Sequence, residues 1–399
     1  MHAVHILHQH LRRHCPGMHL KRLGALVACV SAALLGQRLT LSELGRALPS
    51  RARVKHSIKR VDRLLGNAQL SGERFSIYQA IARWLVGDAP RPIIVIDWSD
   101  LSADRRWQLL RAAIPIGGRT LTLYEEVHGP RYFANARVHR AFLRKLKALL
   151  PQDAIPILIT DAGFRAPWFK AVSRLGWHWI GRVRNRDHVR PQDGHTWVGC
   201  KSLYVNANAR PRALGAYELV RSNPVGCNLY LVKRRKKHRV NKSVFGKRVC
   251  SNQSLKQARA QREPWLLAAS PSLAALAPTE IVNYYAQRMQ IEEAFRDLKS
   301  DRYGLGFELN LSRERERIAT LLLIASLALL VLWQIGAAAI GRRVHLQYQS
   351  NTRKTRPVHS VINLACLILR HVCYSSPPRA IPIHLQPPPS LFRPTLDAL

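Results

Sequence analysis

The residues best suited to chemistry lie in the segment YYAQRMQIEEAFRDLK, which spans residues 284–299. If this segment is one α-helix, each residue turns it by about 100°, so four of its polar side chains fall within about 60° of one another. These are Tyr285, Arg288, Glu292 and Lys299. A carboxylate that shares a face with a phenol and two cations is suited to work beside phosphate groups. A solvent-exposed face crossed by salt bridges has the same pattern.

An apolar stripe beside this face would anchor the helix in a core. It consists of Tyr284, Ile291, Phe295 and Leu298. The neighbouring carboxylates Glu293 and Asp297 fall on other sides of the helix. The geometry therefore selects Glu292 as the functional acid, and it predicts that Glu293 is dispensable for metal binding.

Two aspartates are possible partners for this acid. The apolar run at 93–96 (IIVI) leads into Asp97, and the run at 156–160 (PILIT) leads into Asp161. Continuous apolar runs are typical of central strands that are covered on both faces. If the two strands are parallel neighbours, both carboxylates lie at the same edge of the sheet. A strand-terminal Asp is also common as a helix cap or a turn residue.

Three carboxylates at one edge suggest a site for two Mg²⁺ ions, because Mg²⁺ takes oxygen ligands and keeps positions open for a substrate phosphate. One ion would activate a water or a 3′-hydroxyl, and the other would stabilise the leaving oxygen. We interpret Asp97, Asp161 and Glu292 as this set. The rival carboxylates, none of which ends a buried run so cleanly, are Asp100, Asp104, Glu125 and Glu126.

The charge balance indicates the kind of partner. The formal net charge is +39, from 63 Lys+Arg against 24 Asp+Glu. An excess of this size favours a polyanionic partner, most simply nucleic acid. Electrostatic attraction of this kind gives affinity and salt dependence but no sequence specificity. Hydrophobic residues make up 47% of the chain, which excludes a disordered basic tail as the whole protein.

The cysteines and the N-terminus bear on the compartment. Seven cysteines are scattered along the sequence without a CxxC pair. This spacing supports neither a zinc site nor a disulfide framework, so it indicates a reducing compartment. The N-terminus lacks a convincing secretory signal. We expect a cytoplasmic, nucleoid-associated protein.

One apolar run raises the question of a membrane. Residues 318–340 are long enough to span a bilayer and have charges on both sides. A fully buried helix in a large α/β core gives the same pattern, and the sequence has no second comparable run. We predict a buried core helix and no membrane partner. Detergent-dependent extraction would instead support the membrane alternative.

Residues 1–85 are predicted to form a helical DNA-binding domain. Thr40 and Ser42 are candidate caps for one helix at 41–48, and a second helix continues through 57–65. Two helices joined by a tight turn resemble a helix-turn-helix DNA reader, and a plain basic helix bundle fits equally well. The cations that would contact DNA are Arg53, Lys55, Lys59, Arg60 and Arg63.

Residues 90–184 change to a strand-rich pattern. Apolar strands, a Gly117-Gly118 hairpin signal and two amphipathic helices give the order β-β-β-α-β-α-β. The segment at 284–299 would supply the next helix, which is the order of a ribonuclease H-like domain. We therefore predict an α/β protein whose ribonuclease H-like core is a mixed sheet with flanking helices.

A basic interruption separates the two parts of this core. Residues 182–262 hold 20 Lys+Arg against 3 Asp+Glu, and their strand-like stretches predict a mostly β insertion at 185–275. The core would resume at 276–310, followed by a helical C-terminal region at 311–375 and a Pro-rich tail at 376–399. The insertion residues expected to contact DNA are Lys233, Arg234, Arg235, Lys236 and Lys237.

The sequence resembles a known family. The signature Tyr-x2-Arg-x3-Glu-x6-Lys is met by the four polar residues of the 284–299 segment. Supporting matches run through the chain: HLKRL (19–23), TLSELGR (40–46), KHSIKRVDRLLGN (55–67), VIDWSD (95–100), TLYEE (122–126), DAGF (161–164) and EPW (263–265). The chain is similar to the DDE transposases of bacterial insertion sequences. It resembles most the group that includes the transposases of transposon ten, the closest, and transposon five.

The resemblance implies a reaction and its metal ions. Family members cut and paste DNA: they nick the transposon end, form and open a DNA hairpin, and join the 3′-hydroxyl to target DNA. In this chain Asp97, Asp161 and Glu292 would bind two Mg²⁺ ions per active site, with Mn²⁺ as a possible substitute. An alternative is a transposase-derived DNA-binding protein that has lost catalysis, which the intact triad and signature oppose.

The resemblance also assigns residues to the hairpin step. Trp265 would stack on a base displaced from the duplex, and Met289 would fill the vacated position. Simple core packing is the alternative for Trp265. Tyr285, Arg288 and Lys299 would hold phosphates.

The resemblance further implies the partners. They are double-stranded transposon-end DNA, target DNA and a second copy of the chain in a synaptic complex. The Pro-rich tail departs from the helical C-terminal part that the family pattern leads us to expect, so the sequence does not locate the dimer interface.

Overall fold

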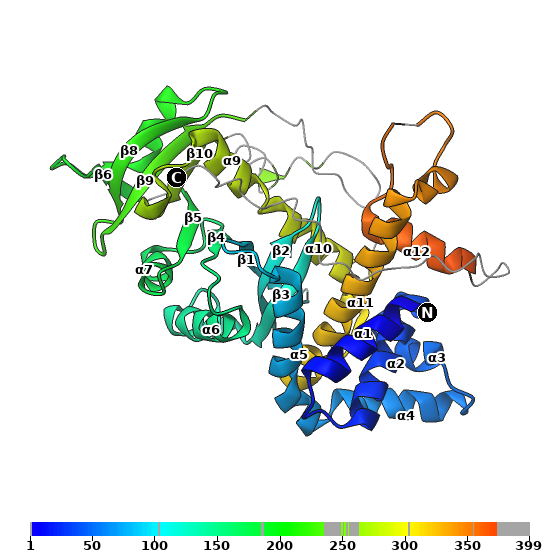
Figure 1. The fold of residues 1–399 in the computed structure, drawn as a ribbon. Helices are drawn as coiled ribbons and strands as arrows, with labels where there is room; N and C mark the ends of the chain where they lie inside the picture. Colours follow the sequence, from blue (N-terminus) through cyan, green and yellow to red (C-terminus); the bar gives the residue numbers. More distant parts are fainter. Residues whose placement is uncertain are drawn as a thin grey trace.

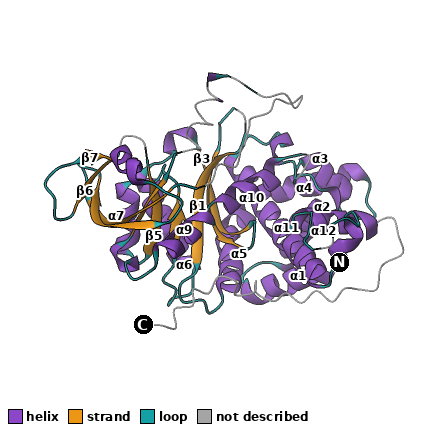
Figure 2. Ribbon diagram, turned by 90° about the horizontal axis from the view of Figure 1, so that it is seen from above, coloured by secondary structure: helices purple, strands orange, loops and turns teal. Residues whose placement is uncertain are grey.

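The structure is a computed structural model, and it describes residues 2–372 apart from 103, 185–186, 235–248, 250, 253, 255–262, 302–303 and 354. Helices at both ends of this range pack together, and a large sheet lies beside them with its own covering helices (Figures 1 and 2). The predicted α/β class with a mixed sheet is confirmed. The predicted tail at 376–399 lies outside the described residues.

The N-terminal part is helical. Its helices are α1 (His2–His14), α2 (Leu20–Gly36), α3 (Leu41–Ala47), α4 (Val54–Leu65) and α5 (Ala68–Val86). The Thr40 side chain caps α3 by accepting a hydrogen bond from the Glu43 N–H, which satisfies a backbone donor that the first helical turn leaves unpaired. Helix α4 presents its cations to solvent and buries Val61 and Leu64 on its other side.

A close approach sets how α3 packs on α4. A Cβ atom at Gly45 would lie 2.5 Å from Ile58 Cγ1 and 2.7 Å from Ile58 Cα. The two helix backbones therefore meet at a position where only glycine fits. The connection between the helices is thus reinforced by a direct contact between their backbones.

All the strands in the described residues belong to one ten-stranded sheet, in the order β3-β2-β1-β4-β5-β10-β9-β8-β6-β7. The first five are β1 (Ile93–Asp100), β2 (Gln108–Pro115), β3 (Thr120–His128), β4 (Ile157–Thr160) and β5 (His178–Val183). The first three form an antiparallel meander, and β1, β4 and β5 pair in parallel. Their continuous burial explains their uninterrupted apolar sequences.

The basic interruption extends this same sheet. Its strands are β6 (His188–Pro191), β7 (Val198–Gly199), β8 (Arg212–Leu219), β9 (Val225–Val232) and β10 (Trp265–Ala269). Strand β10 pairs antiparallel with β5 on one side and with β9 on the other. The inserted strands are therefore held to the core by backbone hydrogen bonds along a shared strand.

Helices cover the two faces of the central strands. Helices α6 (Ala136–Leu149) and α7 (Ala166–Arg174) lie on one face, where the Trp98 indole donates a hydrogen bond to His139 of α6 at 3.0 Å. Helices α9 (Pro278–Ala286) and α10 (Met289–Lys299) lie on the other face, where Arg288 contacts Asp97. Successive residues of a strand point to opposite faces of the sheet, so Asp97 points toward α10 and Trp98 points toward α6.

The apolar run forms the central helix α11 (Arg315–Gly341), and α12 (Val361–Val372) packs against it. Within the described residues α11 is the one helix long and apolar enough to cross a membrane, or one of two if the bent pair α2–α3 counts as a span. However, 94% of its most apolar window is buried inside the protein. Packing against β3, α2 and α5 accounts for that burial.

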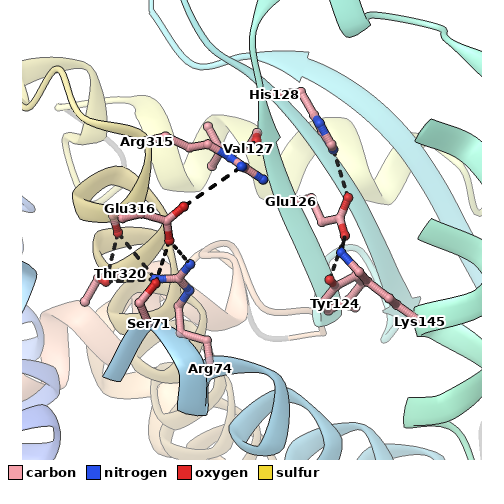
Figure 3. A network of polar contacts seen from close by, with 10 residues as sticks. All are labelled: Ser71, Arg74, Tyr124, Glu126, Val127, His128, Lys145, Arg315, Glu316 and Thr320. Carbon is pink, nitrogen blue, oxygen red and sulfur yellow. Dashed lines mark hydrogen bonds and ion pairs between the residues drawn. The ribbon is translucent and has the colours of Figure 1, made fainter. Parts of the chain in front are cut away.

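Polar contacts join α5, β3, α6 and α11 (Figure 3). Arg74 and Ser71 of α5 both bind Glu316 of α11, and the Arg315 guanidinium donates to the Val127 carbonyl of β3 at 2.8 Å. A second group of contacts joins β3 to α6: Glu126 of β3 accepts hydrogen bonds from Tyr124 and His128 of the same strand and from Lys145 of α6. These contacts tie the N-terminal helices to the edge of the sheet.

Short 3₁₀ turns connect several of these elements. They are Pro130–Tyr132, Cys200–Asn206, Pro271–Leu273, Phe307–Leu309 and Val344–Tyr348.

Replacing Gly45 tests the α3–α4 contact. Gly45→Ala is expected to destabilise the protein by about 1–3 kcal/mol, because the added methyl group would overlap the Ile58 backbone. The matched control is Gly24→Ala in α2, where an added Cβ meets nothing within 4 Å and a helical alanine is favoured. Thermal denaturation of both variants checks this. Equal melting temperatures would contradict the close approach.

Candidate active site

Asp97 and Asp161 lie side by side on neighbouring parallel strands. The β1–β4 pairing ends at Ile96 and Thr160, so the two aspartates are the next residues in register. The sequence prediction that Asp97 ends its strand is wrong, because β1 continues to Asp100 through its pairing with β2. Asp161 does follow the last residue of β4, and its Oδ1 accepts a hydrogen bond from the Gly163 N–H at 2.8 Å.

The segment 284–299 is two helices and not one. Helix α9 ends at Ala286 and α10 begins at Met289. Between them the N–H groups of Arg288 and Ile291 donate to carbonyls three residues earlier, at 3.0 and 3.2 Å. Such a 3₁₀ turn rotates each residue by about 120° in place of about 100°. The prediction of one continuous helix is therefore wrong.

The break places Tyr285 on α9 and the other three signature residues at the start of α10 or within it. Tyr285 is only 3% exposed, whereas the Glu292 side chain is 45% exposed. Lys299 is half-buried at the far end of α10, with its Nζ 6.0 Å from the centre of the Phe295 ring. Burial lowers the pKa of Lys299, while the nearby Glu308 and Asp100 act in the opposite direction.

Arg288 joins two of the candidate carboxylates. Its Nη1 donates to Asp97 Oδ2 at 3.0 Å, and its Nη2 donates to Glu292 Oε1. The Arg288 side chain is 13% exposed. Burial by itself would lower the pKa of Arg288, but Tyr285, Asp97 and Glu292 raise it, so the guanidinium stays charged.

Asp97 lies in a strongly perturbed environment. Burial raises the pKa of its carboxyl to about 7; Arg288 opposes this shift, and the charges of Asp161 and Glu292 add to it. Asp97 therefore lies near enough to both other carboxylates to be affected by their charges. A cation placed among them would relieve that repulsion.

The donor set suits a hard divalent cation, because it offers carboxylate oxygens alone. Among the described residues, no three His, Cys, Asp or Glu side chains lie close enough together to hold a metal ion. The Arg288 guanidinium lies between Asp97 and Glu292 and pairs with both. Asp97, Asp161 and Glu292 fit a metal ion in chemistry, and Arg288 would have to move for all three to bind it.

Trp265 lies at the start of β10 beside α9. Its ring meets the Tyr285 ring edge to face, with centroids 5.0 Å apart, and the Arg234 guanidinium lies 4.8 Å from its centroid. Trp265 is partly buried against the core, so both the packing and the stacking interpretations stay open. Lys233 is exposed like Arg234. Arg235, Lys236 and Lys237 lie outside the described residues.

Met289 is the first residue of α10 and is half-buried. Its Sδ accepts a contact from Arg288 Nη2 at 3.6 Å. The side chain expected to fill a vacated base position therefore lies against the arginine that joins the carboxylates.

Two contacts that the sequence prediction missed position α10. The Gln290 side chain accepts hydrogen bonds from the N–H groups of Ile116 and Gly118 in the β2–β3 turn, at 3.2 and 2.9 Å. At the other end of α10, Asp297 forms a buried ion pair with Arg119. The sequence signal was a carboxylate on the buried side of an amphipathic helix, where an acid needs a partner.

A buried ion pair lies beneath α10. Arg111 of β2 is in register with Glu125 of β3, and its Nη2 lies 2.6 Å from Glu125 Oε2. On its other side, Arg111 is in register with Asp97 of β1. The Arg111 guanidinium lies 5.2 Å from the centre of the Phe295 ring. A charged residue within each of two apolar strands was the available signal.

The cations predicted to bind DNA at the N-terminus lie away from these carboxylates, on the helical part of the chain. Arg53 is the N-cap of α4, and the others lie within that helix. All are exposed; they are Arg53, Lys55, Lys59, Arg60 and Arg63.

A comparison with protein families identifies the class. Residues 88–331 match the family described as a transposase DDE domain. Because the match covers more than half of the 399 residues, the chain belongs to this family. The protein is therefore an enzyme of the DDE transposase class, whose members cleave DNA and transfer its strands. No curated protein matches the sequence.

The raised pKa of Asp97 predicts how stability depends on pH. In metal-free protein, the folded state keeps a proton on Asp97 that the unfolded state releases at lower pH. The free energy of unfolding should therefore fall as pH rises from about 4 to about 7. Urea denaturation in EDTA measures this. Asp97→Asn should reduce the fall, while Glu293→Gln should leave it unchanged; identical pH profiles for all three proteins would contradict the assignment.

Proposed function

We propose that this protein is a cut-and-paste DNA transposase that acts on transposon ends through a hairpin intermediate. The observation that carries the proposal is the meeting of Asp97 and Asp161 on parallel strands with Arg288 and Glu292 from the opposite layer. A ribonuclease H-like core interrupted by inserted β-strands would explain why these groups converge. The resemblance to the transposon ten and transposon five group supports the same reading.

Asp97, Asp161 and Glu292 would hold two divalent ions, Mg²⁺ or Mn²⁺. Bound there, the ions would supply Lewis-acid activation of the attacking oxygen and stabilisation of the leaving oxygen. The chain itself must place the phosphate and hold the carboxylates ionised. Asp97 is the demanding case, because burial favours its protonated form.

Arg288 would couple DNA binding to the assembly of this site. A guanidinium binds a phosphate with two parallel hydrogen bonds, as it binds a carboxylate. A DNA phosphate that enters the site would compete with Asp97 and Glu292 for Arg288. The two acids would then be free for the metal ions, and Arg288 would hold the scissile region.

The hairpin step would use the aromatic side chains at β10 and α9. Trp265 would stack on the displaced base, with Arg234 covering the other side of the ring. Met289 would occupy the vacated position, and Tyr285 and Lys299 would contact phosphates. The end sequence would be read by the N-terminal helices, with α4 presenting its exposed cations.

We further propose a homodimer that bridges two transposon ends and then binds target DNA, in a cytoplasmic, nucleoid-associated setting. The net charge of +39 supports extended contact with DNA.

Triad substitutions test the catalytic proposal. Asp97→Asn, Asp161→Asn and Glu292→Gln should each lower cleavage of transposon-end DNA with Mg²⁺ by roughly a thousandfold or more, since metal binding supplies several kcal/mol of charge stabilisation. The matched control is Glu293→Gln, one residue from Glu292, whose carboxylate pairs with Arg296. Normal cleavage by any triad variant would refute that assignment. A wild-type protein that binds the ends without cutting them would favour the inactive alternative.

Trp265→Ala separates stacking from core packing. If Trp265 holds a displaced base, the variant should nick normally and form less hairpin, by the equivalent of about 1–3 kcal/mol. Gel analysis of the two products on end-labelled DNA measures both steps. If nicking and hairpin formation fall together with the melting temperature, Trp265 is a packing residue.

A further inference from the structure

The outward face of α6 carries a row of four cations that are three or four residues apart, so they share one side of the helix. All four are exposed, and within the described part of the chain none of their side chains has an ion pair or hydrogen bond. Lys145, on another side of α6, is instead paired with Glu126. We call these four residues the α6 cation row: Arg137, Arg140, Arg144 and Lys147.

This row does not serve the stability of the helix. Like charges at these spacings repel one another. Arg137 also lies in the first turn, where the helix dipole disfavours a cation, and that turn contains no acid. A polyanion lying along α6 would relieve both effects.

The length of the row suits a nucleic-acid strand. From Arg137 to Lys147 the helix rises about 15 Å. A strand of DNA places one phosphate per roughly 3.4 Å of axis, so about four phosphates pass along this length. The number of positive charges in the row therefore matches the number of phosphates that pass along it.

Two exposed aromatic side chains lie just before α6. Tyr132 is 38% exposed and Phe133 is 53% exposed. The Arg131 guanidinium lies 4.8 Å from the centre of the Tyr132 ring and donates a hydrogen bond to its hydroxyl at 2.9 Å. The Phe133 ring packs on Trp98, with centroids 5.4 Å apart. Exposed rings flanked by cations are typical of surfaces on which unpaired bases stack.

Both features begin at the sheet edge that carries the catalytic carboxylates. The last residue of β3, His128, is in register with Gln108 of β2, which is in register with Asp100 of β1. Trp98, which supports Phe133, follows Asp97 directly in β1 and points to the opposite face of the sheet. Helix α6 then runs from this edge along the sheet toward the start of β4 (Figure 1).

We propose that the α6 cation row and the Tyr132–Phe133 pair form a second DNA-binding surface. The row holds the phosphates of DNA that extends past the active site, and the aromatic pair stacks bases that become unpaired beside the cleavage point. The surface is separate from the exposed cations of α4. It deepens the proposed function and rests on it for the identity of the DNA.

The salt dependence of binding tests the cation row. The full-length protein is titrated in EDTA with a duplex of arbitrary sequence over a range of salt concentrations. Arg140→Ala/Arg144→Ala should lower the slope of log affinity against log salt by about 2, because two phosphate contacts are lost. The control is Arg353→Ala/Arg356→Ala, which removes the same charge from the exposed loop before α12, a helix far from α6 in Figures 1 and 2. Equal slopes for the two double variants would overturn the proposal.

A second probe tests the aromatic pair. The same duplex carrying a run of mismatched bases should bind the wild type more tightly than the paired duplex does. Phe133→Ala should lose about fivefold or more of the affinity for the mismatched duplex alone, and Phe133→Tyr should keep it. An unchanged preference in Phe133→Ala would refute stacking at this site.

These measurements are independent of the proposed cleavage reaction. Binding in EDTA requires no metal and no catalysis, so a protein that fails to cut transposon ends can still show the effect of the row. Conversely, normal cleavage together with equal salt slopes would leave the proposed function intact and refute this surface alone.

Discussion

The ion pairs of Arg288 with Asp97 and Glu292 are the contact on which the site depends. Desolvating a carboxylate is costly, and the cost is offset only when a cation lies close by. Asp97 is buried beside Asp161, so without Arg288 two acids would repel each other in a region that excludes water. The same contact holds the start of α10 onto the sheet. One guanidinium thus balances the charge of a buried acid and fixes the helix that carries Glu292.

Other contacts hold α10 in a fixed position against the sheet that contains β1. Gln290 ties one end of the helix to the β2–β3 turn, and the Asp297–Arg119 ion pair ties the other. The inserted strands join the core through β10, which pairs directly with β5. Trp265 therefore has its place fixed by backbone hydrogen bonds and lies against Tyr285 of α9. A residue from the inserted strands and a residue from the helices of the core therefore meet at this point.

The large positive charge is divided between two uses. Cations inside the protein, such as Arg111 and Arg119, pair with buried acids and hold layers together. Cations on the outer faces of α4 and α6 are exposed. Only the second group is available to a polyanion, and its salt-dependent attraction is the kind expected for DNA. Composition alone does not separate the two groups, because a pairing depends on which strands and helices meet.

The sequence by itself determined the α/β class, the order of the core strands and helices, the transposase family and the buried apolar helix predicted at 318–340, because hydrophobic periodicity and residue spacing are local properties. The carboxylates at 97 and 161 were found for the same reason. Only the tertiary structure decided that β1 runs past Asp97, that the 284–299 segment breaks at Arg288, and that Arg288 lies between two acids. Those features arise from a strand pairing with β2 and from charges that meet across layers. The contact between Arg288 and Asp97 joins residues 191 positions apart, which no local pattern records.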